Sequence, residues 1–192
     1  MNNHLDQIKF QLTEASGMMH QMKDDCSQSI ADAAQVMISA LENGNKILWC
    51  GNGGSAAQAQ HLSTEVIGGL RDHVRPGKAS ISLTTDSSFL TAWPNDVGFD
   101  TLFSRQVESL GQKGDVLIGI STSGNSDNIV KAVESAGDLG MKVIVFTGRD
   151  GGKLAKSGDV MISIPSDDTQ HIQEGHITAG HIVCELVEQA FS

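Results

Sequence analysis

The sequence contains no apolar run that approaches the roughly 20 residues of a membrane-spanning helix. Its first residues, MNNHLDQIKFQLTE, have neither a basic start nor an apolar signal core, so secretion and membrane association are not expected. Cysteine is scarce: Cys26, Cys50 and Cys184 stand far apart and form no CxxC pair. These thiols are expected to be reduced and mostly buried, which predicts a cytoplasmic protein.

Basic residues are also few, because 13 lysines and arginines stand against 23 aspartates and glutamates, a formal net charge of −10. This balance argues against binding to DNA or RNA, whose phosphates require a basic surface. A small anionic ligand is not excluded, since one site can be locally positive on an acidic protein. The 192 residues, 39% hydrophobic and 19% charged, predict a single globular domain over residues 1–192.

Residues 1–43 are expected to be helical and to mediate oligomerisation. Apolar side chains recur there at alternating steps of three and four residues: Leu5, Ile8, Leu12, Ala15, Met19, Met22 and Cys26. Such a heptad seam favours pairing with another helix in an oligomer, or packing of an amphipathic helix on its own domain. We favour the oligomer, because the seam is long and precedes the first predicted strand.

From residue 46 onward the pattern alternates between apolar strands and helices. Strands are expected at 46–50, 79–83, 115–121, 142–148 and 159–165. Helices are expected at 55–67, 87–93, 101–110, 125–139, 152–156 and 169–190. This alternation predicts an α/β fold with a five-stranded parallel sheet and helices on both faces. Residues 71–79, RDHVRPGKA, are expected to form an exposed loop.

Two small polar loops follow strands of this sheet, GNGGS at 51–55 and STSGNS at 121–126. Ligands of parallel sheets bind beyond the carboxyl ends of the strands. Each loop leads into a helix, whose free N–H groups and positive dipole end suit a phosphate. Turn formation and helix capping account for either loop alone, whereas two such loops at one edge favour phosphate binding. Neither contains GKS, GKT or GxGxxG, so a nucleotide is not indicated.

Four polar side chains are candidates for chemistry beside these loops. His61 and Glu65 are four residues apart on a predicted helix and share one face. Gln173 and His181 can point into one cavity, because they lie off the apolar stripe of the last helix: Ile172, Ala179, Val183, Leu186 and Ala190. The alternatives are a solvated ion pair for His61 and Glu65, and a hydrogen-bonded, partly buried imidazole for His181.

A carboxylate and an imidazole beside a phosphate pocket suit proton transfer next to a carbonyl, through an enediol. That is the chemistry of aldose–ketose isomerisation. The sequence indicates no strong nucleophile, since Ser55 has no elbow motif and no Ser–His–Asp order is identifiable. His171 and His176 are expected behind the site or at the surface.

Five segments carry a family resemblance: CGNGGSAAQAQHLSTE (50–65), ND (95–96), FSRQVESLG (103–111), GDVLIGISTSGNS (114–126) and IQEGHITAGH (172–181). Through them the chain resembles the phosphoheptose isomerases of the sugar isomerase (SIS) domain superfamily over almost its whole length. The resemblance implies a flavodoxin-like SIS fold assembled as a homotetramer around a helical bundle. It implies conversion of sedoheptulose 7-phosphate to D-glycero-D-manno-heptose 7-phosphate, toward the heptose of bacterial lipopolysaccharide.

The same resemblance implies roles for individual residues. It makes Glu65 the base and His181 its acid–base partner. It puts substrate contacts on Asn52, Gly53, Gly54, Ser55, Glu65, Asn95, Asp96, Ser121, Thr122, Ser123, Ser126 and Gln173. It implies a divalent ion, usually zinc, on His61, Glu65, Gln173 and His181. Glutamine is not among the usual zinc ligands, whereas hard-metal sites accept amide oxygens more readily.

Four positions depart from the family pattern. Gln58 replaces a frequent aspartate, Gly69 and His171 replace frequent arginines, and Pro94 precedes a turn expected at Asn95 and Asp96. These departures bear on substrate affinity and leave the catalytic pair intact.

Two readings compete with the enzyme. One is a non-catalytic SIS-domain partner of the replication initiator DnaA; such paralogues tend to lose the residues that match Glu65 and His181, and both are present here. The other is a sugar-phosphate-sensing regulatory module, which is normally fused to a DNA-binding domain, and none is visible in the sequence.

Overall fold

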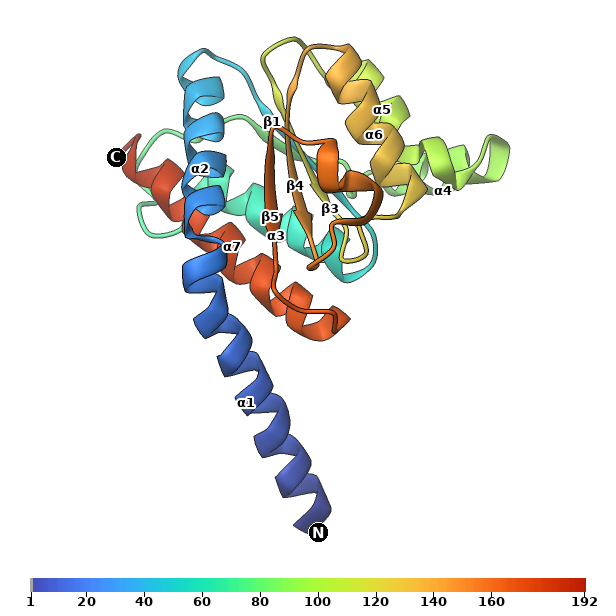
Figure 1. Cartoon of the computed structure of the whole chain (residues 1–192). Coiled ribbons are helices and arrows are strands. Elements are labelled where there is room, and N and C mark those ends of the chain that lie inside the picture. The colour runs from blue at the N-terminus through green and yellow to red at the C-terminus, as the bar shows by residue number, and fades with distance from the viewer. Residues whose placement is uncertain (1) are drawn as a thin grey trace.

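The centre of the fold is a five-stranded sheet, all parallel, in the order β2-β1-β3-β4-β5 (Figure 1). The computed structural model describes residues 2–192, so Met1, where the predicted domain and helical segment begin, lies outside the described residues. The strands are β1 (Ile47–Gly51), β2 (Ser80–Ser82), β3 (Val116–Ile120), β4 (Lys142–Thr147) and β5 (Val160–Ser163). The predicted parallel α/β sheet is confirmed.

Helices cover both faces of the sheet, and the central strand β1 buries side chains on each of them. In β1, Ile47 and Trp49 pack on one face with α2 (Ser27–Glu42), α3 (Gly54–Gly68) and α7 (Thr169–Gln189). Leu48 and Cys50 pack on the other face with α4 (Ser87–Asp96), α5 (Leu102–Leu110) and α6 (Asp127–Asp138). All four side chains are fully buried, so β1 reads as a continuous apolar run rather than an alternating one.

The predicted N-terminal helix divides into α1 (Asn2–Asp25) and α2, which meet at Cys26. The apolar seam divides as well: Met22 and Cys26 are buried against the domain. Leu5, Ile8 and Leu12 are 58%, 53% and 67% exposed on the part of α1 that extends away from the sheet (Figure 1). One half of the seam therefore packs on its own chain, and the other half is left open.

The strand order creates one reversal point in the sheet. The chain moves from β1 outward to β2, and then returns to the other side of β1 to form β3. Open α/β sheets bind ligands at such a point, beyond the carboxyl ends of the two diverging strands. The loops 51–55 and 121–126 leave β1 and β3 there, so the topology brings both predicted loops to one place.

The connections on the other face differ from prediction at Pro94. Asn95 and Asp96 form the last turn of α4 instead of a separate turn. Pro94 stands inside the helix and removes one N–H donor from it. The helix nevertheless continues to Asp96, and the N–H groups of Val97 and Gly98 both donate to the Trp93 carbonyl. Two 3-10 helices, η1 (Phe99–Thr101) and η2 (Gly152–Lys156), complete the chain. None of the helices within residues 2–192 combines the length and apolarity that crossing a membrane requires.

Candidate active site at the β1–β3 edge

The first loop turns directly from β1 into α3. Gly53 has a φ of +54°, a conformation that glycine adopts at little cost, and Gly54 begins the helix. A Cβ at Gly51 would lie 2.6 Å from the Ser55 carbonyl oxygen, so the turn requires glycine at that position too. The turn therefore presents Asn52, Gly53, Gly54 and the buried Ser55 together at the start of α3.

The second loop gathers its hydroxyl groups beside the start of α6. Ser121 Oγ and Ser126 Oγ lie 3.2 Å apart. Ser126 occupies the N-cap of α6, yet in the described structure its hydroxyl makes no capping bond. The Thr122 carbonyl accepts from the Gly148 N–H at 2.9 Å, which ties the loop to the end of β4. Helix capping therefore does not account for the Ser126 hydroxyl, which can donate to a ligand.

A pair of asparagines joins the two loops. Asn52 Nδ2 donates to Asn128 Oδ1 and Asn128 Nδ2 donates to Asn52 Oδ1, both at 2.9 Å. Asn128, in the first turn of α6, is only 2% exposed. Our sequence analysis ended the loop at Ser126 and missed this residue. A buried polar side chain needs a partner, so an asparagine beside the apolar Ile129 is the signal that identifies it.

The two helices α3 and α7 run side by side in the same direction. Leu62 meets α7 at Gly180, where an added Cβ would lie 2.4 Å from Leu62 Cδ1, so glycine permits the close approach. At the amino ends, Gly54 lies against the Gln173 side chain. Gln58 Nε2 donates to the Gln173 carbonyl at 2.7 Å, a bond that an aspartate at this position could not donate. This packing sets the spacing of the side chains along the seam.

His61 and Glu65 of α3 meet His181 of α7 midway along that seam. Their donor atoms all lie within 4.8 Å of one another. His61 Nε2 is 2.8 Å from His181 Nε2 and 3.4 Å from Glu65 Oε1. His61 is exposed, whereas Glu65 and His181 are partly buried. The structure therefore brings together three of the four predicted metal residues, and Gln173 lies further toward the start of α7.

Two imidazoles and one carboxylate that converge from two helices fit a divalent cation, because such ions take nitrogen and oxygen donors in this combination.

The thiols of Cys50 and Cys184 are poor alternatives as reactive groups. Burial raises the pKa of the Cys184 thiol to about 12, and Cys50 is raised to about the same pKa by the same cause. Acid–base and metal chemistry thus fall to the imidazoles and the carboxylate.

Two further histidines, predicted to lie behind the site or at the surface, are both buried. His176 is fully buried, donates from Nε2 to the Thr147 carbonyl at 3.0 Å, and packs edge-on against Phe146. Burial lowers its pKa to about 4, only partly opposed by the bond to Thr147. His171 is 8% exposed and lies 2.9 Å from Glu174 Oε2. His176 is therefore part of the core and outside the reactive cluster.

Asn95 and Asp96 are the predicted site residues that stand apart. Both are exposed at the end of α4. Within residues 2–192, their side-chain hydrogen bond is to each other, from Asn95 Nδ2 to Asp96 Oδ1 at 2.7 Å. Any part they play in substrate contact stays a prediction.

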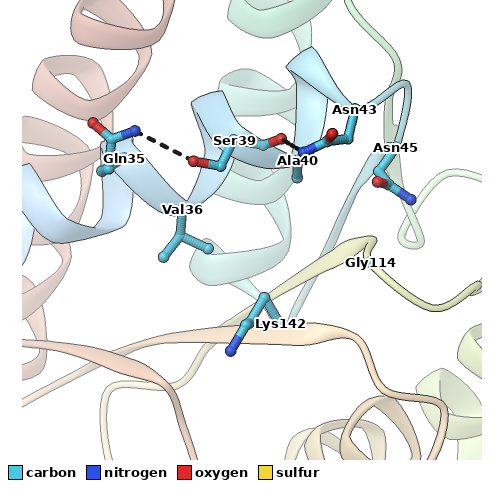
Figure 2. Close-up of a pocket in the computed structure, with 8 residues that line it drawn as sticks. All are labelled: Gln35, Val36, Ser39, Ala40, Asn43, Asn45, Gly114 and Lys142. Atoms are coloured by element: carbon cyan, nitrogen blue, oxygen red, sulfur yellow. Dashed lines mark hydrogen bonds between the residues drawn. The ribbon is translucent and has the colours of Figure 1, made fainter.

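Cavities lie at both edges of the sheet, and their linings differ. Figure 2 shows a cavity of about 380 Å³ between α2 and the amino ends of β3 and β4, where Gln35 donates to Ser39 Oγ. Lys142 is the one charged group that lines it. A cavity of about 150 Å³ at the carboxyl edge touches Thr122, Ser123 and the guanidinium-bearing Arg149. Of these two cavities, the one at the carboxyl edge is lined by residues of the predicted phosphate loop.

Comparison with known proteins places this geometry in a family. The SIS domain model matches residues 12–148. The phosphoheptose isomerase of Aquifex aeolicus is 49% identical over 185 residues, which covers 96% of each chain. That of Helicobacter pylori strain HPAG1 is 56% identical over 155 residues, or 81% of this chain and 80% of the relative. The solved phosphoheptose isomerase of Francisella tularensis superposes with a TM-score of 0.94 at 39% identity, covering 97% of this chain and 98% of that one.

Proposed function

The chain belongs to the SIS domain family and, within it, to the phosphoheptose isomerases, and from this premise we propose the reaction that it catalyses. The protein is an aldose–ketose isomerase that converts sedoheptulose 7-phosphate to D-glycero-D-manno-heptose 7-phosphate. The observation that carries this proposal is the meeting of Glu65 on α3 with His181 on α7, where α3 is the helix that begins at the loop 51–55. The product leads to the heptose of bacterial lipopolysaccharide.

We propose that the loop 121–126 holds the phosphate. Its hydroxyl donors, Ser121, Thr122, Ser123 and Ser126, stand at the start of α6, where unpaired N–H groups and the helix dipole attract an anion. The loop 51–55, the glycine loop, lets backbone atoms of residues 52–54 approach the sugar, because no side chain projects from Gly53 or Gly54. Gln173, Asn95 and Asp96 complete the proposed sugar contacts.

Glu65 acts in this proposal as the base that moves the carbon-bound proton. It removes a proton from C1 of the ketose, which yields an enediol, and returns a proton to C2. His181 moves the hydroxyl proton between the oxygens on C1 and C2, so that the C2 carbonyl becomes a hydroxyl and C1 becomes the aldehyde. The partial burial of both side chains supports this role, since proton transfer gains from a site sheltered from water.

His61, Glu65 and His181 would hold the divalent ion, for which we propose zinc, whereas Gln173, also predicted as a ligand, lies against Gly54 and is assigned to the substrate. The fit rests on the two imidazole nitrogens and Glu65 Oε1 that already converge. When bound, the ion supplies Lewis-acid stabilisation of charge that develops on the substrate oxygens. Glu65 has a second oxygen, Oε2, besides the one that faces His61, which leaves an atom for the proton.

We propose that the protein is a homotetramer of the cytoplasm, assembled through residues 1–43. The exposed apolar residues Leu5, Ile8 and Leu12 support pairing of α1 with other copies, because isolated helices rarely leave such a seam in water. The three free, buried cysteines fit a reducing compartment. Light scattering on the eluting protein measures the mass of the assembly.

The alternative of a non-catalytic DnaA partner finds no support. Glu65 and His181 are present and lie within one cluster, and the relatives that cover almost the whole chain are isomerases. No observation favours it over the enzyme.

The experiment that tests the function is proton exchange followed by NMR. The protein is incubated with sedoheptulose 7-phosphate in heavy water, with and without a chelator. Deuterium at C1 or C2 together with heptose phosphate would establish isomerisation through an enediol. Loss of both signals on chelation, and their return with zinc, would make the metal essential. A folded protein that yields neither exchange nor product would refute the proposed function.

A further inference from the structure

The loop between α3 and β2 was expected to be exposed, yet it contains a buried cation. The Arg75 side chain is 2% exposed. Its Nη2 donates to the carbonyl oxygens of Glu65 and Val66, at 3.0 and 3.1 Å. These carbonyls belong to the last turn of α3, and they also accept the N–H groups of Gly69 at 3.0 Å and of Lys78 at 3.4 Å. Arg75 therefore fastens the turn that carries Glu65, and its charge complements the negative end of the helix dipole.

The same guanidinium is tied to α7 through Glu188. Arg75 Nε lies 3.4 Å from Glu188 Oε2, and the Glu188 side chain is 5% exposed. The carboxylate also accepts the N–H groups of Leu70 at 2.7 Å, Arg71 at 2.9 Å and Asp72 at 3.2 Å. Burial opposes the charge of Glu188, but these bonds outweigh it and hold the pKa of Glu188 below its usual range. A charged group so enclosed keeps one fixed position.

Glu188 stands seven residues after His181 on α7. Seven residues are close to two helical turns, so the two side chains project from the same face, about 10 Å apart along the axis. Arg75 thus spans from the backbone of Glu65 on one helix to the face of α7 that presents His181. The Leu62–Gly180 contact allows the helices to approach, and the Gln58–Gln173 bond joins them near their amino ends. Arg75 and Glu188 join them again beyond Glu65.

We propose that Arg75 and Glu188 are positioning residues, which hold α3 and α7 in the register that sets Glu65 opposite His181. This inference rests on the proposed roles of Glu65 and His181. Neither positioning residue touches the substrate; each acts through the backbone of α3 and α7. A lysine cannot replace the arginine, because it lacks the planar fork that reaches two carbonyls and a carboxylate at once.

The test compares Arg75→Lys with a matched control, Asp115→Asn. Like Glu188, Asp115 is a buried carboxylate. It is 1% exposed and accepts from the Lys46 side chain, the Lys46 N–H at 3.0 Å and the Gln112 N–H at 2.8 Å. It lies before β3, at the amino edge of the sheet, far from both loops. Loss of the Asp115 carboxylate should lower stability without changing α3 or α7. The control variant therefore separates an effect on stability from an effect on positioning.

Two readouts decide the question. The first is kcat and KM for sedoheptulose 7-phosphate. The second is the zinc affinity of the metal-free protein, measured by competition with a chromophoric chelator. Arg75→Lys is expected to lower kcat and zinc affinity about tenfold each, as changes around a metal site commonly do, while KM stays within about twofold. Asp115→Asn is expected to lower the unfolding temperature and to leave kcat and zinc affinity near wild type.

The proposal fails if folded Arg75→Lys keeps wild-type kcat and zinc affinity, or if Asp115→Asn loses as much of both for an equal loss of stability. Glu188→Gln is measured in the same way and decides the matter if Arg75→Lys does not fold. Absence of turnover in the wild-type protein would refute the proposed function instead. In that case the ratio of zinc affinities between wild type and variant still tests the positioning.

Discussion

Replacing Gly54 with alanine puts a methyl group where the Gln173 amide lies. The added carbon would stand 2.6 Å from Nε2, 2.7 Å from Oε1 and 2.9 Å from Cδ of Gln173, whereas ordinary contacts begin at 3.4 Å. The amide must therefore retreat by about 0.8 Å, the difference between 3.4 and 2.6 Å. The displaced atoms are the far end of a flexible side chain, so the backbone of α7 is not required to move.

This displacement should impair the reaction and spare the fold. Misplacement of a contact group by about 1 Å can cost on the order of 100-fold in rate. We expect kcat/KM to fall by about 10- to 100-fold, equivalent to about 1.4 to 2.7 kcal/mol of transition-state stabilisation. Gly54 begins α3 and has no left-handed backbone angle, so alanine is compatible with the helix and should not lower the unfolding temperature.

The matched control is Gly137→Ala in α6, where an added Cβ meets nothing within 4 Å. Its kcat/KM should equal that of wild type. Steady-state kinetics on Gln173→Ala and on the double variant Gly54→Ala/Gln173→Ala complete the cycle. If the methyl group acts through Gln173, the double variant is no worse than Gln173→Ala alone. Wild-type kcat/KM for Gly54→Ala, or losses that simply add, would refute the reasoning.

Three further changes test other parts of the site and core. Glu65→Gln should keep the fold and bind the phosphosugar, measured by calorimetry, but lose turnover, since an amide cannot accept the proton; an active variant would remove Glu65 as the base. Asn128→Ala leaves Asn52 without its partner, which should cost about 1–3 kcal/mol of stability in urea unfolding and raise KM through a loosened glycine loop; an unchanged KM would count against the link between the loops. The pKa of His176, lowered by burial from 6.5 to about 4, makes stability depend on pH. As pH falls from 6.5 toward 4 the unfolded chain gains a proton that the folded chain refuses, so stability should drop by up to about 3 kcal/mol. His176→Gln, which can still donate to the Thr147 carbonyl, should lack that drop, and an identical pH profile would show that other groups cause it.

The sheet was predictable because buried parallel strands have a recognisable sequence pattern. Residues 46–50 and 142–148 are short apolar runs between turn residues, and the structure confirms strands at both with bounds that differ by a residue. The order of strands and helices then fixes which ends of the strands share an edge. The loops 51–55 and 121–126 could therefore be assigned to one edge of the sheet from the sequence alone.

Burial of polar side chains was less predictable, because it depends on partners far away in the sequence. His176 falls in the stripe formed by Ile172, Ala179 and Val183, so its spacing indicated the core although its chemistry suggested the surface. Arg75 had no such signal. Its loop is polar, and only the carboxylate of Glu188, 113 residues later, reveals why the guanidinium is buried.

The site itself shows the same division. The spacing of His61 and Glu65 placed both on one face of a helix, which the structure confirms. His61 and His181 are 120 residues apart in the sequence, so their meeting required the contact of two distant helices, and glycine at position 180 permits the close approach. The family resemblance supplied this pairing; periodicity alone could not.

The order of synthesis adds one consequence of the packing of α7 against α3. All five strands and α3 precede α7 in the chain. A growing polypeptide that has left the ribosome as far as β5 can pair its strands, yet it offers an incoming cation only the His61 and Glu65 donors. Incomplete ligand sets hold ions weakly, and retention of a metal is coupled to completion of the fold. The proposed cation is therefore expected to be retained only after α7 has docked on α3.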